Sequence, residues 1–279
     1  MTCALAVAVL VSTLAQPGTG GTFSSGISGE TQFVVTQGDF PSSELEVITD
    51  STSTFDIRML NLPGNPRLAM QNIWAYRIEG VDTRERLFTV NQQTSTPTRL
   101  STLFNITGPG GITGTALLVQ YLTQFVGDRA ALEQVMYVRN TGSVPFQVQI
   151  FNYMDLDPNG STDHAASGAF SGFVMSDGPN TLNWGGFGPA VIEADPYGGP
   201  GWVRDKLGDG NIDNLDNTGV PMMGNFTGAM QWTVNVPLVS QVGVRSLTSS
   251  VGINTAPIPA PGTMGVACAA LMIGVRRRR

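Results

Sequence analysis

Short runs rich in β-branched and aromatic residues recur along the middle of the chain, and clusters of Gly, Pro, Asn, Asp and Ser separate them. This succession of apolar runs and turn-forming clusters is typical of β-strands. The pattern therefore predicts a chain built mainly from short strands. The clearest runs cover residues 44–49, 54–60, 72–79, 86–91 and 98–107.

Residues 144–156 form the most regular of these runs. The turn formers within residues 138–143 predict a hairpin that joins this strand to the one before it. The segment is similar to a pattern that recurs in secreted bacterial β-sandwich proteins of unknown function, and this resemblance implies no activity. The alternation places four side chains on one face of the strand, namely Phe146, Val148, Ile150 and Asn152.

Residues 112–139 fit two different structures. Their apolar and aromatic positions match the stripe of an amphipathic helix, and they also match two strands that turn at Gly127 and Asp128. The content of Thr, Val and Tyr and the strand-rich neighbours favour the two strands. Further along, residues 229–236 and 239–251 predict a closing pair of strands separated by Pro237.

Together these elements predict an all-β fold, a single antiparallel β-sandwich over residues 33–253. Residues 16–32 are rich in Gly, Ser and Thr and predict a flexible linker before it. Residues 254–279 predict a tail that contains an apolar helix. Of the 279 residues, 41% are hydrophobic and only 13% are charged, which excludes acidic disorder. Glycine shows no three-residue period, which excludes collagen.

The first fifteen residues are almost wholly apolar and end in small residues at Thr13 and Ala15. Such a segment, 1–15, is typical of a secretory signal peptide, here cleaved after Ala15. It contains no Lys or Arg, which leaves the true start codon open. A buried strand is the alternative interpretation of this segment.

The end of the chain has a Pro-rich spacer, an apolar run and four arginines, in that order. Arginines after an apolar run remain on the cytoplasmic side and stop export. The run over residues 262–275 is shorter than the roughly 17–25 residues of a spanning helix, and snorkelling arginines with local bilayer thinning compensate for part of the difference. This order of features predicts a membrane anchor.

The same tail resembles the PEP-CTERM protein-sorting signal of bacteria. Ala260 stands where that family usually has Glu. The resemblance implies two partners, the export translocon and an exosortase-type membrane protease, and it implies nothing about the domain in front. An anchor that is never cut is the alternative. The residues that carry the resemblance are Pro259, Ala260, Pro261, Gly262, Thr263, Arg276, Arg277, Arg278 and Arg279.

Both cysteines, Cys3 and Cys268, lie in these two end segments. The sequence therefore predicts an exported domain without disulfides, catalytic thiolates or cysteine-ligated zinc. Loss of the four terminal arginines lowers Lys plus Arg from 15 to 11 against 21 acidic residues, so the net charge changes from −6 to −10. An acidic surface repels phosphates, which excludes nucleic acid as a partner.

Two acidic segments match part of a calcium loop, in which alternate oxygens converge on the ion. Neither has the Glu expected at the twelfth position, which excludes a complete helix–loop–helix calcium site. A calcium ion at a sandwich edge, an ion shared by both segments and a solvated turn all remain open. The candidate ligands are Asp155, Asp157, Asn159 and Asp163 in the first segment, and Asp209, Asn211 and Asp213 in the second.

Catalytic chemistry has little support in the sequence. The single His164 and the single Lys206 lie in no nucleophile motif. Paired carboxylates across a cleft hydrolyse glycosides, and the candidates are Glu79, Glu133, Glu193 and Asp195. Large aromatic residues either stack on sugars or fill a β core, and the candidates are Trp74, Trp184, Trp202 and Tyr197.

We therefore expect an exported, non-enzymatic protein of the cell envelope, outer surface or extracellular matrix. Its tail holds it at the membrane, and processing of the tail would release it. The alternative is a calcium-dependent β-sandwich that binds or cleaves carbohydrate, with a polysaccharide as partner. A surface-layer or adhesion component is a third interpretation.

Overall fold

The computed structural model describes eleven stretches of the chain. The predicted strand over residues 44–49 and both end segments lie outside them. The described residues are 21–24, 32–37, 55–60, 67–125, 129–157, 164–169, 172–177, 180–189, 191–219, 221–238 and 244–254.

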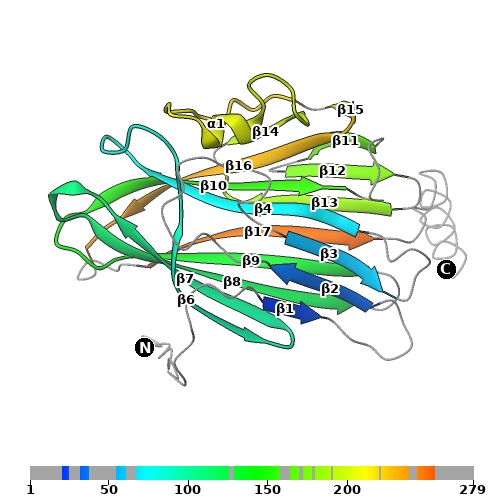
Figure 1. Ribbon diagram of the computed structural model, residues 1–279, viewed down its shortest axis with the longest axis horizontal. Coiled ribbons are helices and arrows are strands. Elements are labelled where there is room, and N and C mark those ends of the chain that lie inside the picture. Colours follow the sequence, from blue (N-terminus) through cyan, green and yellow to red (C-terminus); the bar gives the residue numbers. More distant parts are fainter. Residues whose placement is uncertain are drawn as a thin grey trace, which may run out of the picture.

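The described strands form two antiparallel sheets (Figure 1). In sheet A the strand order is β1-β2-β3-β4-β10-β16-β14, and β5 also pairs with β4. Its strands are β1 (Gly21–Ser24), β2 (Gln32–Gln37), β3 (Phe55–Leu60), β4 (Arg67–Ile78), β5 (Arg86–Leu87), β10 (Phe146–Leu156), β14 (Val191–Pro196) and β16 (Phe226–Val236).

Sheet B follows the order β15-β11-β12-β13-β17-β9-β8-β7-β6. Its strands are β6 (Thr89–Thr96), β7 (Arg99–Thr107), β8 (Thr113–Phe125), β9 (Arg129–Asn140), β11 (His164–Ala169), β12 (Gly172–Asp177), β13 (Asn180–Phe187), β15 (Met222–Gly224) and β17 (Val244–Asn254). A 3-10 turn, η1 (Pro109–Gly111), precedes β8, and one short helix, α1 (Val203–Gly208), follows β14.

The inner faces of the two sheets share one hydrophobic core, which is the arrangement of a β-sandwich. Sheet A contributes Trp74 and Trp232, whose rings stack with centroids 6.0 Å apart. Sheet B contributes Phe173 and Trp184, which stack at 5.2 Å. The prediction of a mostly β chain with antiparallel sheets is confirmed.

The predicted alternation of β10 is also confirmed. Phe146, Val148 and Ile150 lie in the shared core, and Asn152 is fully buried beside them. The Asn152 amide donates a hydrogen bond to Oδ1 of Asn72 at 2.8 Å. A buried amide on this face is satisfied by a neighbouring side chain, as burial of a polar group requires.

Residues 112–139 form two strands, so the helical alternative is wrong. β8 and β9 pair directly, with Thr115 opposite Arg139 and Leu122 opposite Leu132. Their buried residues alternate with half-buried or exposed ones, which is the period of a strand in a sheet with one covered face. The proposed turn at Gly127 and Asp128 lies outside the described residues.

Two predicted strand pairings are wrong. β9 lies in sheet B and β10 in sheet A, so the turn between them crosses from one sheet to the other instead of closing a hairpin. β16 and β17 also lie in different sheets, because β16 pairs with β10 and β14 while β17 pairs with β13 and β9. Turn-forming residues predict a change of direction, but they do not specify which sheet the next strand joins.

Residues 197–219, which we call the cap, cover the outer face of sheet A at β4, β10, β14 and β16. The cap contains α1, which contacts β14 and β16 (Figure 1). Val203, Leu207 and Leu215 of the cap form a second hydrophobic cluster with outward-facing residues of the sheet, including Phe151 and Tyr153. The part of sheet A beneath the cap is therefore buried on both faces, which explains why β10 is buried at nearly every position.

Four residues of the predicted linker, Gly21–Ser24, form β1 and pair with β2. The candidate signal peptide and the sorting tail lie outside the described residues. Within the described part of the chain, no helix has the length and apolar character needed to cross a membrane.

Candidate functional site

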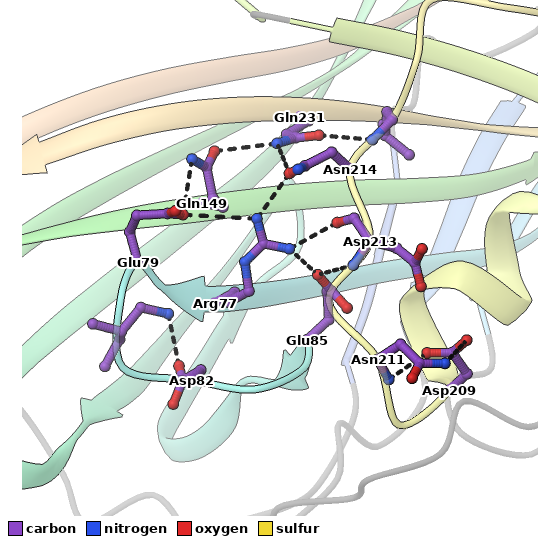
Figure 2. A network of polar contacts seen from close by, with 12 residues as sticks. Arg77, Glu79, Asp82, Glu85, Gln149, Asp209, Asn211, Asp213, Asn214 and Gln231 are labelled. Atoms are coloured by element: carbon purple, nitrogen blue, oxygen red, sulfur yellow. Dashed lines mark hydrogen bonds and ion pairs between the residues drawn. The ribbon is translucent and has the colours of Figure 1, made fainter.

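The most extensive polar network lies between the cap and the outer face of sheet A (Figure 2). Its centre is Arg77, an outward-facing residue of β4 that is only 2% exposed. The guanidinium contacts the Glu85 carboxylate and donates a hydrogen bond to the backbone oxygen of Asp213 at 2.7 Å. It also donates to Oδ1 of Asn214 at 2.8 Å. Arg77 thus connects the sheet, the loop after β4 and the cap.

Two glutamines extend this network across the sheet. Gln149 of β10 lies opposite Arg77. Nε2 of Gln231, on β16, donates to Oε1 of Gln149 at 3.2 Å and to Oδ1 of Asn214 at 3.0 Å. Oε1 of Gln231 accepts a hydrogen bond from the backbone N–H of Leu215 at 2.9 Å. Side chains of β4 and β16 therefore hold the backbone of the cap, and Gln149 of β10 is linked to them through Gln231.

Glu85 is the buried acid of the network. Burial raises the pKa of its carboxyl above the ordinary value, and this effect exceeds the opposing attraction of Arg77. One carboxylate oxygen also accepts a hydrogen bond from the backbone N–H of Asp213 at 3.2 Å. Removing Arg77 would leave this acid in an apolar environment without its cation, so the two residues depend on each other.

A second buried acid, Glu193, lies on the outer face of β14. The Lys206 ammonium of α1 contacts its Oε1, and the Asp216 backbone N–H donates to its Oε2 at 2.9 Å. Burial raises the pKa of Glu193, while Glu193 raises the pKa of Lys206 against the opposite effect of burial. This ion pair holds the helix and the end of the cap on β14.

The last residues of the cap run beside β14. The Ile192 backbone N–H donates to Oδ1 of Asn217 at 3.0 Å, and the Ala194 N–H donates to the Thr218 oxygen at 3.1 Å. Gly219 follows with φ +99°, where a Cβ would lie 1.5 Å from the Ala194 oxygen. Only glycine fits at this position, because both the backbone angle and the space exclude a side chain.

The second acidic segment forms the exposed tip of the cap. Both carboxylate oxygens of Asp209 accept hydrogen bonds from Asn211, at 2.7 Å from its backbone N–H and 3.0 Å from Nδ2. Burial, followed by the nearby Asp209, raises the pKa of Asp213. The structure therefore brings these three candidate ligands together, with Asn211 presenting its amide nitrogen to Asp209. Calcium binding here stays a prediction.

The first acidic segment lies at the other end of sheet A. Asp155 and Asp157 are 4% and 6% exposed, and Asn159 and Asp163 lie outside the described residues. Asp155 and Gln149 are both on β10, six residues apart, and Gln149 is the residue that lies opposite Arg77. At ~3.4 Å per residue, this separates Asp155 from the Arg77 row by about 20 Å along β10. Asp155 is therefore too far from Asp213, which lies beside Arg77, for the two to share one ion.

The four candidate carboxylates for glycoside hydrolysis fall in three places. Glu79 is at the end of β4, Glu133 is on sheet B, and Glu193 and Asp195 occupy alternate positions of β14. Glu193 and Asp195 are thus the pair that the structure brings onto one strand, and Glu193 is already held by Lys206. The side chain of His164 lies outside the described residues.

The aromatic candidates lie mainly in the protein interior. Trp74 and Trp184 are 3% and 1% exposed and fill the shared core. Trp202 is also buried, with the Arg204 guanidinium 4.4 Å from its ring centroid. Tyr197 packs edge-on against Trp202 and is 41% exposed, so it is the one member of this set with a substantial exposed surface.

Sequence reasoning missed Arg77, Glu85, Gln149 and Gln231. A signal was present around Arg77, because residues 73–76 are apolar at both alternating positions. Such a strand is buried on both faces, and a charged residue within it needs a buried partner. The position of Glu85 eight residues later did not identify it as that partner.

No three His, Cys, Asp or Glu side chains gather into a metal-binding group within the described part of the chain. The charged groups of the site pair with one another across the cap and the sheet. These groups attach the cap to the sheet, since each buried acid contacts a cation and accepts a hydrogen bond from a backbone N–H. No protein-family model matches the chain, and no curated protein matches it.

Proposed function

We propose that this protein is an exported, non-enzymatic component of the cell envelope or extracellular matrix. One antiparallel β-sandwich forms its folded body, and a short apolar helix in the tail holds it at the membrane. An exosortase-type protease recognises the tail and releases the domain. The observation that supports this function is the order of features in the tail, where the Pro-Gly-Thr motif is followed by the apolar run and then by four arginines.

The geometry of the polar site supports a structural role. Arg77 and Lys206 both connect sheet A to a different segment of the chain. Glu85 and Glu193 lie beneath the cap, at 2% and 0% exposure, where they hold backbone groups in place. Acids used in this way contribute to a rigid body, which is what a matrix or envelope component requires.

Substitution of the tail tests this function. Changing Arg276 through Arg279 to glutamine in the native host removes the basic cluster and keeps the length of the tail. The parent protein is expected in the membrane fraction and the medium. The variant is expected to leave the membrane fraction and to pass further into the medium, because nothing stops its export. A parent protein found in the cytosol would contradict the proposal.

The carbohydrate alternative is separated by a second measurement. A glycan array and hydrolysis assays on polysaccharides are expected to show no turnover with the purified chain. Robust turnover that is lost in Glu193→Gln, with folding retained, would favour the glycosidase interpretation.

A further inference from the structure

The outer face of sheet B differs from that of sheet A because the cap does not cover it. Outward positions of β7, β8 and β9 lie side by side in the register, with Leu103 opposite Leu117 and Leu117 opposite Tyr137. The next row contains Val135, which is half-buried, and Val119, which is 8% exposed. Tyr137 is 41% exposed, although it lies on a central strand. We call this surface the B face.

An exposed aromatic residue extends the B face on the side of β13. Phe187 lies opposite Thr248 of β17, which is opposite Val135 of β9. Phe187 is 84% exposed. Contiguous apolar side chains on a sheet surface are typical of a protein-binding surface.

The B face is also basic, in a chain of net charge −6. Its outward positions include Arg99 on β7 and Arg129 and Arg139 on β9. The acid among them is Glu133, which accepts a hydrogen bond from Tyr121 and raises the pKa of that phenol to about 12. The arginines at these outward positions outnumber the single carboxylate, which makes this face attractive to an acidic partner.

The cap has the complementary character. It lies on the opposite side of the sandwich, since it packs on the outer face of sheet A. Its exposed residues include Asp205, Asp209 and Asp216, and Ile212 among them is 54% exposed. One surface therefore presents arginines around apolar side chains, and the other presents carboxylates around an apolar side chain.

We propose that the B face binds the cap of a second copy of this chain, so that copies join head to tail. This inference rests on the proposed function, and it names the partner of an envelope or matrix protein. Pairing of two B faces would bring three arginines of one copy against three of the other, which is repulsive. Because the cap and the B face lie on opposite sides, each copy can bind two others. Such a heterologous contact forms an open chain unless its rotation closes a ring.

The area of the B face indicates how stable the contact can be. Five strands at ~4.8 Å spacing and the four outward rows from Arg139 to Glu133 at ~6.8 Å cover about 24 by 27 Å, or about 650 Å², and Arg129 lies two rows beyond them. Stable interfaces bury about 800 Å² per partner, so we expect a weak contact. Exposed charges are screened within about 8 Å at physiological ionic strength and about 3 Å at 1 M salt. Association should therefore need high protein concentration and should decrease in sodium chloride.

Complementary variants test the head-to-tail contact. The face variant carries Arg99→Glu and Arg139→Glu, and the cap variant carries Asp205→Lys and Ile212→Lys. The full chain is purified in mild detergent, and its mass is followed by sedimentation velocity from micromolar to several hundred micromolar protein. All variants share the same tail, so association through the tail is common to all of them. Arg84→Glu, in the turn after β4, is the matched control for a charge reversal.

The parent chain and Arg84→Glu are expected to associate in proportion to concentration, and each interface variant alone is expected to remain monomeric. A 1:1 mixture of the two variants should form dimers and nothing larger, because each retains one intact surface. Three results would overturn the proposal: a monomeric parent chain, association of the face variant alone, or a mixture that stays monomeric. If the parent is monomeric but binds polygalacturonate through Arg99 and Arg139, the B face takes an acidic glycan instead. Cell fractionation decides the proposed function separately, so the two failures are distinguishable.

Discussion

Replacement of Arg77 by methionine tests the importance of the buried network directly. Methionine keeps much of the volume of the arginine stem and lacks the guanidinium. The change removes the contact with Glu85 and the hydrogen bonds to the Asp213 oxygen and to Asn214. It leaves the Glu85 acid buried at 2% exposure beneath the cap.

The magnitude follows from this burial. Breaking a buried ion pair by removal of one partner costs about 3–5 kcal/mol. Total stabilities are about 5–15 kcal/mol, so Arg77→Met should remove a large part of the free energy of unfolding. The double variant Arg77→Met with Glu85→Leu removes both charges. It should lose only about 1–3 kcal/mol, mainly from the unpaired backbone groups of Asp213.

Guanidinium chloride unfolding at pH 7 measures these losses, and hydrogen exchange locates them. Amides of residues 203–219 should exchange faster in Arg77→Met, since the cap loses its main polar attachment. Arg99→Met is the matched control on an exposed arginine, and its effect should stay within about 0.5 kcal/mol. If Arg77→Met costs no more than the control, or if the double variant is worse than the single one, the network does not hold the cap.

Three further predictions concern the site. The pKa values of Glu85, Glu193 and Asp213 are raised in the folded state, so the folded chain binds protons more readily than the unfolded chain. The melting temperature should therefore rise when the pH is lowered from 7.5 to 5.5, and a fall would contradict these pKa shifts. In Glu193→Gln the melting temperature should change less over the same pH range. Gly219→Ala should lose at least about 2 kcal/mol because a Cβ there meets the Ala194 oxygen, whereas Gly188→Ala, with φ +68° and open space, should lose about 1 kcal/mol; equal losses in urea unfolding would refute the steric argument. Calcium is predicted to raise the melting temperature through Asp155 and Asp157, and Asp157→Ala should abolish that rise, whereas a parent chain without any rise would exclude the site.

The strands could be predicted from the sequence because their signal is local. The alternation in β10 and the β-branched content of residues 112–139 identify strands without knowledge of their neighbours. Sheet membership is not local, and the two wrong hairpins show this. The turns before β10 and after β16 reverse or redirect the chain, but each passes to the opposite sheet.

The cap was recognised only as an acidic loop. Its apolar residues Val203, Leu207 and Leu215 are widely spaced and show no strand period. Their partners on sheet A are far away in the sequence, as are Arg77 and Asp213, which are 136 residues apart. Long-range pairing of single residues leaves no pattern in one sequence, so the network required the structure.

Intact-mass spectrometry of the protein recovered from its native host tests whether the chain is exported and processed through its tail. Membrane and medium fractions are measured separately. We expect a chain that begins at Gln16, and in the medium a chain that has also lost a C-terminal piece beginning near Pro259. A chain that retains Met1–Ala15, or one that keeps Arg276–Arg279 in every fraction, would contradict export and processing through the tail.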